Sequence, residues 1–161
     1  MLVTMDEQRR EIPDGALLVR DQVIEAVGTT AELTERLNRS GETPDEILNL
    51  SGHVLLPGLI NTHHHMSQSL IRAVPTAQNQ GLYGWIEALC KFWPGLTPDM
   101  IYGSALTAMA ELILSGCTTS SDHLYIYPNG SRMDDEIRAA QEIGNTCPGT
   151  GGGGLHTRRI R

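Results

Sequence analysis

The sequence predicts an α/β fold, because strand-like and helix-like patterns alternate along it. Residues 54–60 form an almost continuous apolar run, which is typical of a strand buried on both faces of a parallel sheet. Residues 98–113 then carry apolar side chains at helical spacing, and residues 117–121 form a second short run compatible with a strand. Strand, helix and strand in this order are the pattern of a parallel βαβ unit.

The first fifty residues predict short strands and one helix. Residues 15–20 and 23–28 are strand-length runs separated by two residues, which indicates a hairpin. Residues 31–38 form a candidate helix that begins after Thr29 and Thr30, two residues that can cap a helix. Because an isolated hairpin is only marginally stable in water, we expect this segment to join a larger sheet.

Further helices are predicted at residues 83–93 and 134–143, on either side of the helix at residues 98–113. That middle helix has clear boundary signals, since Thr97 can cap its start and Pro98 suits its first position. The last helix begins with consecutive acidic residues, which we expect to favour its N-terminal end rather than to bind a metal: Asp134, Asp135 and Glu136.

Composition excludes several classes of protein. The chain has 161 residues, of which 40% are hydrophobic and 19% charged, as in a globular domain. Its formal charge of -7 argues against a nucleic-acid partner. No apolar run approaches the roughly 18 residues of a membrane helix, and the start does not resemble a signal peptide. Cys90, Cys117 and Cys147 are odd in number and widely spaced, which favours a reducing cytoplasm.

Three consecutive histidines follow the first apolar strand, at His63, His64 and His65. On an extended strand the side chains of His63 and His65 lie on the same face, roughly 6.5 to 7 Å apart along the chain, so both imidazoles can reach one ion. Zinc is the first choice of metal, with iron and others as alternatives. A solvated loop is the alternative without a metal. A catalytic zinc takes three or more protein ligands, so further ligands are expected elsewhere.

The same segment resembles a known signature. Residues 56–65, LPGLINTHHH, resemble the first-strand motif of the amidohydrolase superfamily, Pro-Gly-apolar-apolar-Asp/Asn-x-His-x-His. Residues 66–75, MSQSLIRAVP, and residues 114–123, LSGCTTSSDH, resemble the deaminase branch that contains 8-oxoguanine deaminase and hydroxytriazine aminohydrolases. The resemblance extends from about residue 3 to about residue 144.

This resemblance implies the N-terminal part of a (β/α)8 TIM-type barrel, preceded by part of a small β-sandwich. Residues 1–53 would belong to the sandwich and residues 54–144 to the first βα units of the barrel. A whole barrel takes roughly 250 residues, so the barrel is expected to be incomplete and the chain to be a fragment of a longer enzyme. Residues 145–161 depart from the family with a glycine-rich tail, for which we consider a flexible linker and favour a truncated or out-of-frame end.

The resemblance also implies an activity and a site. His63 and His65 match two ligands of one divalent metal ion, Gln68 matches a position that contacts the heterocyclic substrate, and His123 lies at the expected pocket rim without an assigned role. The general base is expected in later strands, so no catalytic residue is assigned. The implied reaction is hydrolytic deamination of an aminated N-heterocycle, in which the metal activates water as the nucleophile.

Several alternatives stay open at this stage. 8-Oxoguanine is the first choice of substrate, and an s-triazine or a pterin is the alternative. In a different class of function, the chain is a truncated, non-catalytic form with at most weak metal binding, and the isolated 161-residue form is expected to be inactive. The expected partners are a small heterocycle and water, with no nucleic acid and no membrane, while a homo-oligomer is left open.

Overall fold

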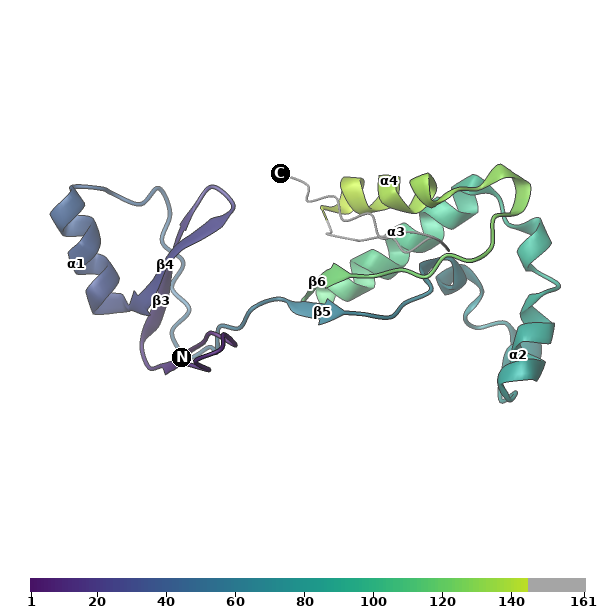
Figure 1. Ribbon diagram of the computed structural model, residues 1–161, viewed down its shortest axis with the longest axis horizontal. Helices are drawn as coiled ribbons and strands as arrows, with labels where there is room; N and C mark the ends of the chain where they lie inside the picture. The colour runs from purple at the N-terminus through teal and green to yellow at the C-terminus, as the bar shows by residue number, and fades with distance from the viewer. Residues whose placement is uncertain (145–161) are drawn as a thin grey trace. The chain divides into compact units, whose positions relative to one another are not determined.

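The computed structural model describes residues 1–144. They form two compact units, Met1–Pro57 and a second unit that begins at Gly58, each with its own contacts (Figure 1). The glycine-rich tail predicted at residues 145–161 lies outside the described residues. Within residues 1–144, no helix combines the length and the apolar character needed to cross a membrane.

The first unit contains two antiparallel strand pairs and one helix. Strand β1 (Leu2–Val3) pairs with β2 (Glu11–Ile12), and β3 (Gly15–Arg20) pairs with β4 (Val23–Thr29). The predicted hairpin is therefore confirmed. Asp21 in its two-residue turn has a positive φ of 54°, a conformation that a short polar side chain tolerates better than most.

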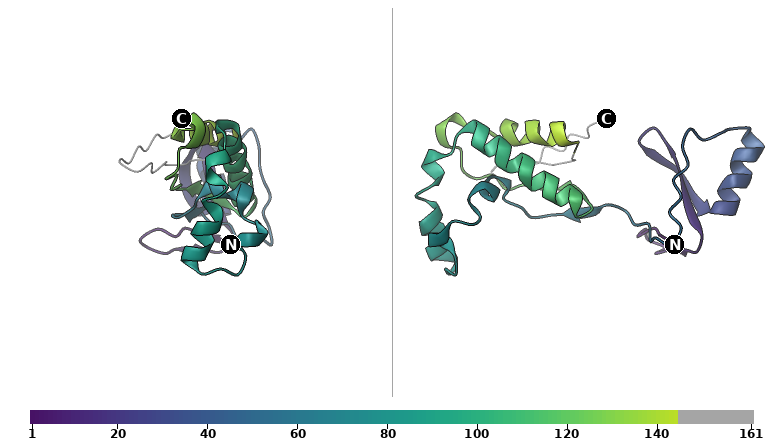
Figure 2. Two further views of the ribbon diagram at one scale, coloured as in Figure 1. Left: turned by 90° about the vertical axis from the view of Figure 1, so that its right-hand side faces the viewer. Right: turned by 180° about the vertical axis from the view of Figure 1, so that it is seen from behind.

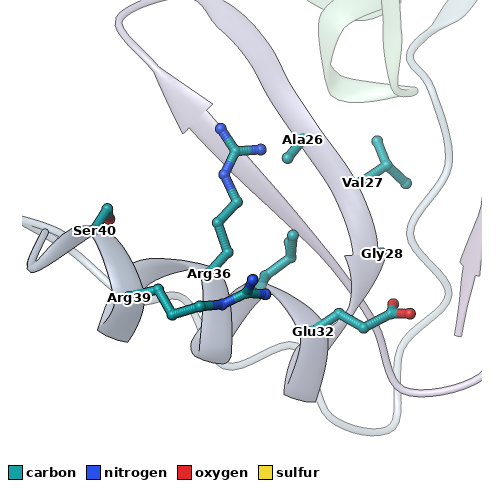
Figure 3. A pocket seen from close by; sticks show the side chains of 8 residues that line it. Ala26, Val27, Gly28, Glu32, Arg36, Arg39 and Ser40 are labelled. Atoms are coloured by element: carbon teal, nitrogen blue, oxygen red, sulfur yellow. The ribbon is translucent and has the colours of Figure 1, made fainter.

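Helix α1 (Thr30–Ser40) confirms the predicted helix and extends it by a residue at its start and by two at its end. Thr29 caps it, because its Oγ1 accepts a hydrogen bond from the Glu32 N–H at 3.2 Å while Glu32 accepts one from the Thr29 N–H at 2.8 Å. An open pocket of about 660 Å³ lies along β4 and α1 (Figure 3). None of the predicted site residues lines it.

The second unit contains the predicted parallel βαβ unit. Strands β5 (Leu59–Asn61) and β6 (Cys117–Ser120) pair in parallel, with Leu59 opposite Cys117 and Asn61 opposite Ser120. Helix α3 (Pro98–Leu114) connects them, and Thr97 caps it as predicted. Helix α4 (Met133–Ile143) follows β6 and ends at Gly144, also as predicted. The two strands therefore bring their carboxyl ends together at one edge.

Helix α3 is the centre of the packing in the second unit. It lies against α4 and against a short 3-10 helix at Met66–Ile71 (Figure 2). The buried side chains at these contacts are small or flexible, which lets the helices approach closely: Met66, Ala105, Ala108, Met109, Ala139 and Ala140. A second cluster joins the end of the 3-10 helix to helix α2 (Leu82–Leu89) through Ile71 and Leu89.

Two expectations about elements were wrong in detail. The strand predicted over residues 54–60 is regular only at Leu59–Asn61, and Leu59 and Ile60 are 58% and 68% exposed rather than buried. Burial on both faces needs covering layers, and within residues 1–144 β5 pairs only with β6. The helix predicted over residues 83–93 ends at Leu89, and a separate 3-10 turn at Trp93–Gly95 precedes α3. Pro94 favours this break, because it lacks an N–H group and disfavours a helical residue before it.

Gly58 permits a close approach between the two strand segments. A Cβ atom at Gly58 would lie 2.5 Å from Thr118 Cγ2 and 2.8 Å from Thr118 Cβ, too close for any real contact. Gly58→Ala is therefore expected to lower the free energy of unfolding by about 2 kcal/mol, the usual cost of overpacking. Urea denaturation measures this change. Gly103→Ala, inside α3 where nothing lies within 4 Å of the added atom, serves as the control and should raise stability by about 0.5 to 1 kcal/mol.

Candidate active site

The three consecutive histidines lie in a loop directly after β5, which we call the histidine loop (residues 62–65). The loop turns where β5 ends, because the Asn61 side chain accepts a hydrogen bond from the His63 N–H at 3.0 Å. The rings of His63 and His65 lie edge to face, with their centroids 5.0 Å apart. The structure thus brings together the two side chains that the sequence singled out as metal ligands.

A hydrogen bond fixes the chemical form of His65. Its Nδ1 lies 2.9 Å from the backbone oxygen of His123, and an oxygen of this kind can only accept. Nδ1 of His65 therefore carries the ring proton, which leaves the lone pair on Nε2. Metal-binding histidines use this arrangement, in which a carbonyl or carboxylate holds the other ring nitrogen. The donor chemistry of His65 fits a metal ligand.

His123 brings a third imidazole to the same place. It follows β6, and its ring centroid lies 4.6 Å from that of His63 and 5.8 Å from that of His65. Its backbone N–H donates to the carbonyl of His64 at 2.9 Å, which ties the two strand ends together. Within residues 1–144, however, no three His, Cys, Asp or Glu side chains have a spacing that would hold a metal. The described part of the chain supplies an incomplete ligand set.

A cavity of about 380 Å³ opens beside the histidine loop. Its apolar wall includes Trp85 and Leu89, and its polar wall includes the Arg72–Glu111 ion pair. The two guanidinium-to-carboxylate distances of that pair are 2.5 and 2.7 Å, and the pairing lowers the pKa of Glu111. A cavity lined by both aromatic or apolar side chains and polar groups is suited to a flat, polar-edged ligand.

Gln68, which the resemblance matched to a substrate-contacting position, lines this cavity. Its Nε2 donates to the Tyr125 hydroxyl at 2.5 Å, and the Tyr125 ring lies 5.2 Å from the His65 ring. Partial burial raises the pKa of Tyr125, so the hydroxyl stays protonated. Tyr125 is not among the site residues that the sequence predicts. Its position two residues after His123, in the segment that follows β6, was the available signal.

His64 also lines the cavity and differs from its neighbours in its surroundings. Its partial burial lowers the pKa of the imidazole, and the negative charge of Asp122 opposes that shift. His64 is therefore a neutral ring at neutral pH.

Two buried carboxyl groups lie beneath the histidine loop. Asp122 is fully buried, and its Oδ1 accepts a hydrogen bond from the Met66 N–H at 2.6 Å. Glu136, in the first turn of α4, is 2% exposed and contacts Asp122. Burial, reinforced by Asp122, raises the pKa of Glu136 to about 10.

This burial corrects one expectation about the acidic cluster at the start of α4. Asp135 does support the helix start, because its carboxylate accepts from the Arg132 N–H at 2.9 Å. Glu136 does not act there as a solvent-facing charge, because its side chain turns inward under the loop. The pattern alone placed all three acids at a helix end and could not show that one of them is covered.

The second unit is a parallel βαβ unit, and a histidine pair that follows its first strand lines a cavity. The chain is therefore of the α/β class, with a candidate metal site beyond the carboxyl ends of its strands. The comparison with known families is more specific. Residues 54–151 match the model of the amidohydrolase family, and the chain belongs to that family.

Several curated proteins are similar to this chain. It is 38% identical over 132 residues to an 8-oxoguanine deaminase of Pseudomonas aeruginosa, an alignment that covers 81% of this chain and 28% of that protein. It is 37% identical over 151 residues to a hydroxydechloroatrazine ethylaminohydrolase of Pseudomonas sp. strain ADP, covering 89% of this chain and 31% of the relative. The chain therefore spans less than a third of the length of these relatives.

The solved structures show the same partial coverage. A mutant of atrazine chlorohydrolase from Arthrobacter aurescens, complexed with zinc and atraton, superposes with a TM-score of 0.71 at 25% identity. The match covers 92% of this chain and 33% of that protein. The described residues therefore have the fold of about a third of such an enzyme, without a closed barrel.

Proposed function

We propose that this chain is the N-terminal portion of a metal-dependent hydrolase that deaminates an N-heterocycle, with 8-oxoguanine as the first substrate. The observation that carries the proposal is the meeting of the His63 and His65 rings, together with the hydrogen bond that frees Nε2 of His65. Membership of the amidohydrolase family and the 38% identity to an 8-oxoguanine deaminase support it.

The proposed architecture is the start of a (β/α)8 barrel preceded by part of a β-sandwich. Residues 1–53 would belong to the sandwich and residues 54–144 to the first βα units. The parallel pairing of β5 with β6 through α3 supports the barrel assignment, because each step of such a barrel is a parallel βαβ unit. The exposed Leu59 and Ile60 on β5 fit a strand that further elements would cover.

We propose that His63 and His65 hold one divalent ion, with zinc as the first choice. Imidazole nitrogen suits zinc, and the zinc in the related chlorohydrolase structure supports this choice. When bound, such an ion activates a water molecule for hydrolysis. The remaining ligands and the general base would come from outside residues 1–144.

The chain's own residues bind and orient the substrate in this proposal. With one Nε2 hydrogen donated to Tyr125, Gln68 keeps its carbonyl oxygen and its second amide hydrogen for the edge of a heterocycle. Trp85 and Leu89 cover one side of the cavity with apolar surface. We propose that a planar ring lies against them, with its polar edge toward Gln68 and its reactive carbon toward His63 and His65.

An s-triazine aminohydrolase is the second candidate, favoured by the 37% identity to the hydroxydechloroatrazine enzyme. An s-triazine and an oxidised purine are both flat, nitrogen-rich rings with amino substituents, and the cavity lining suits either. The rates of amine release from the two kinds of substrate distinguish these candidates. We also propose a cytoplasmic location, which Cys90 and Cys117, both free within residues 1–144, support.

The experiment compares the 161-residue chain with a longer form that carries a complete barrel. Zinc content is measured after dialysis, and release of ammonia or alkylamine is measured with 8-oxoguanine, an aminated hydroxytriazine and a pterin. The longer form is expected to retain zinc and to act fastest on 8-oxoguanine. The 161-residue chain is expected to release no amine, because two imidazoles are fewer than the three ligands a catalytic zinc takes. Turnover by the short chain, or a zinc-free longer form, would contradict the proposal.

A further inference from the structure

The pair of buried carboxyl groups, Asp122 and Glu136, has no role in the proposed reaction so far. Asp122 lies two residues after the end of β6 and Glu136 lies in the first turn of α4, and the two meet in the interior beneath the histidine loop. Two ionised carboxylates in such a place would repel each other and would both lack hydration. The contact is therefore stable only when the pair holds a proton.

The surroundings place that proton on Glu136. Burial and the neighbouring Asp122 raise the pKa of Glu136 to about 10. At neutral pH its carboxylic O–H therefore donates to Asp122, which in turn accepts the Met66 N–H at 2.6 Å. The result is a short chain of hydrogen bonds from α4, through the end of β6, to the histidine loop.

The third link of this chain is next to His65. Met66 follows His65 directly, so the Met66 N–H belongs to the peptide group that joins the two residues. The Met66 carbonyl is held as well, by the Ser104 hydroxyl of α3 at 2.7 Å. Both peptide groups that flank the Met66 Cα are thus fixed. The orientation of the peptide group between His65 and Met66 sets the direction of the His65 side chain.

We propose that Glu136 is a positioning residue, which donates a hydrogen bond to Asp122 so that Asp122 can hold the Met66 peptide and thereby aim His65. This rests on the proposed function in one respect, namely that His65 is the imidazole that needs aiming. The positioning itself is a property of the metal-free chain, where the hydrogen bond of His65 Nδ1 to the His123 carbonyl reports it.

The test compares Glu136→Gln, which keeps a hydrogen-bond donor of the same size, with Glu136→Met, which keeps the size and removes the donor. Nitrogen NMR of the metal-free 161-residue chain gives the tautomer of His65, and hydrogen exchange gives the protection of the Met66 amide. Wild type and Glu136→Gln are expected to show Nδ1-protonated His65 and a protected Met66 amide. Glu136→Met is expected to show mixed tautomers and a Met66 amide that exchanges at least about tenfold faster, while amides of α3 such as that of Met109 keep their protection.

A zinc titration of the same variants, made in the longer form that carries the complete barrel, separates this inference from the proposed function. Glu136→Met is expected to weaken zinc binding by about tenfold or more, the usual effect of losing a supporting hydrogen bond, and Glu136→Gln to restore it. If the longer wild-type form binds no zinc but the NMR differences appear in the 161-residue chain, the proposed metal site is wrong and the positioning stands. If Glu136→Met keeps the His65 tautomer and the Met66 protection, or if Glu136→Gln loses them equally, the positioning role is wrong.

Discussion

His63→Ala is expected to abolish turnover in a form of this protein that carries the complete barrel, and to lower its bound zinc well below one ion per chain. The substitution removes one of two imidazoles that meet at 5.0 Å after β5. Loss of a metal ligand removes several kcal/mol of transition-state stabilisation. At about 1.4 kcal/mol per factor of ten, this corresponds to a loss of at least about 10³-fold in kcat/KM. Steady-state assays and metal analysis of the same preparation measure both effects.

His53→Ala is the matched control, because His53 is an exposed histidine of the first unit. Its Nδ1 lies 3.2 Å from the carbonyl oxygen of Ser51, a residue of the same local turn. It should keep wild-type activity and zinc content. His65→Ala should behave like His63→Ala. A His63→Ala variant with wild-type rate and metal content would show that the ligand assignment is wrong, whereas equal losses in His53→Ala would point to a general effect of losing a histidine.

Local signals were sufficient to predict most helices and the hairpin. Thr29 and Thr97 cap the helices that follow them, and Gly144 ends α4, because capping depends on residues adjacent in sequence. The closeness of His63 and His65 was also predictable from their spacing of two residues, although both lie in the loop after β5 and not on the strand itself. These features need no knowledge of distant contacts.

The features that the sequence did not reveal all depend on distant contacts. The His65 hydrogen bond reaches the carbonyl of His123, 58 residues away, and Gln68 meets Tyr125 across 57 residues. The burial of Glu136 depends on how α4 packs on α3 and beside Asp122, which no periodicity reports. The exposure of Leu59 was missed for a similar reason, since an apolar run shows that a strand can be buried but not which layers are present to cover it.

The stability of the chain is expected to fall as pH rises from about 5 to 7, through Glu136. The folded-state pKa of about 10 lies above the ordinary value of 4.5. Between these values the folded chain holds a proton that the unfolded chain has released, so the contribution of Glu136 is complete below pH 4.5 and is lost progressively as pH rises toward 10. The slope for one proton is about 1.4 kcal/mol per pH unit, which gives about 2 to 3 kcal/mol over this interval.

Glu136→Gln removes this dependence, because an amide neither gains nor loses the proton. Urea denaturation at about pH 5, 6 and 7 should therefore show the variant gaining stability relative to wild type at each step. The other titrating groups are the same in both proteins, so their contributions cancel in the difference. Asp134→Asn, which removes an exposed charge from the same helix turn, is the control for the loss of a negative charge at this helix end. A constant difference between Glu136→Gln and wild type would mean that Glu136 is ionised in the folded chain. In that case two carboxylates would lie side by side under the histidine loop, and the hydrogen-bond chain to His65 could not exist.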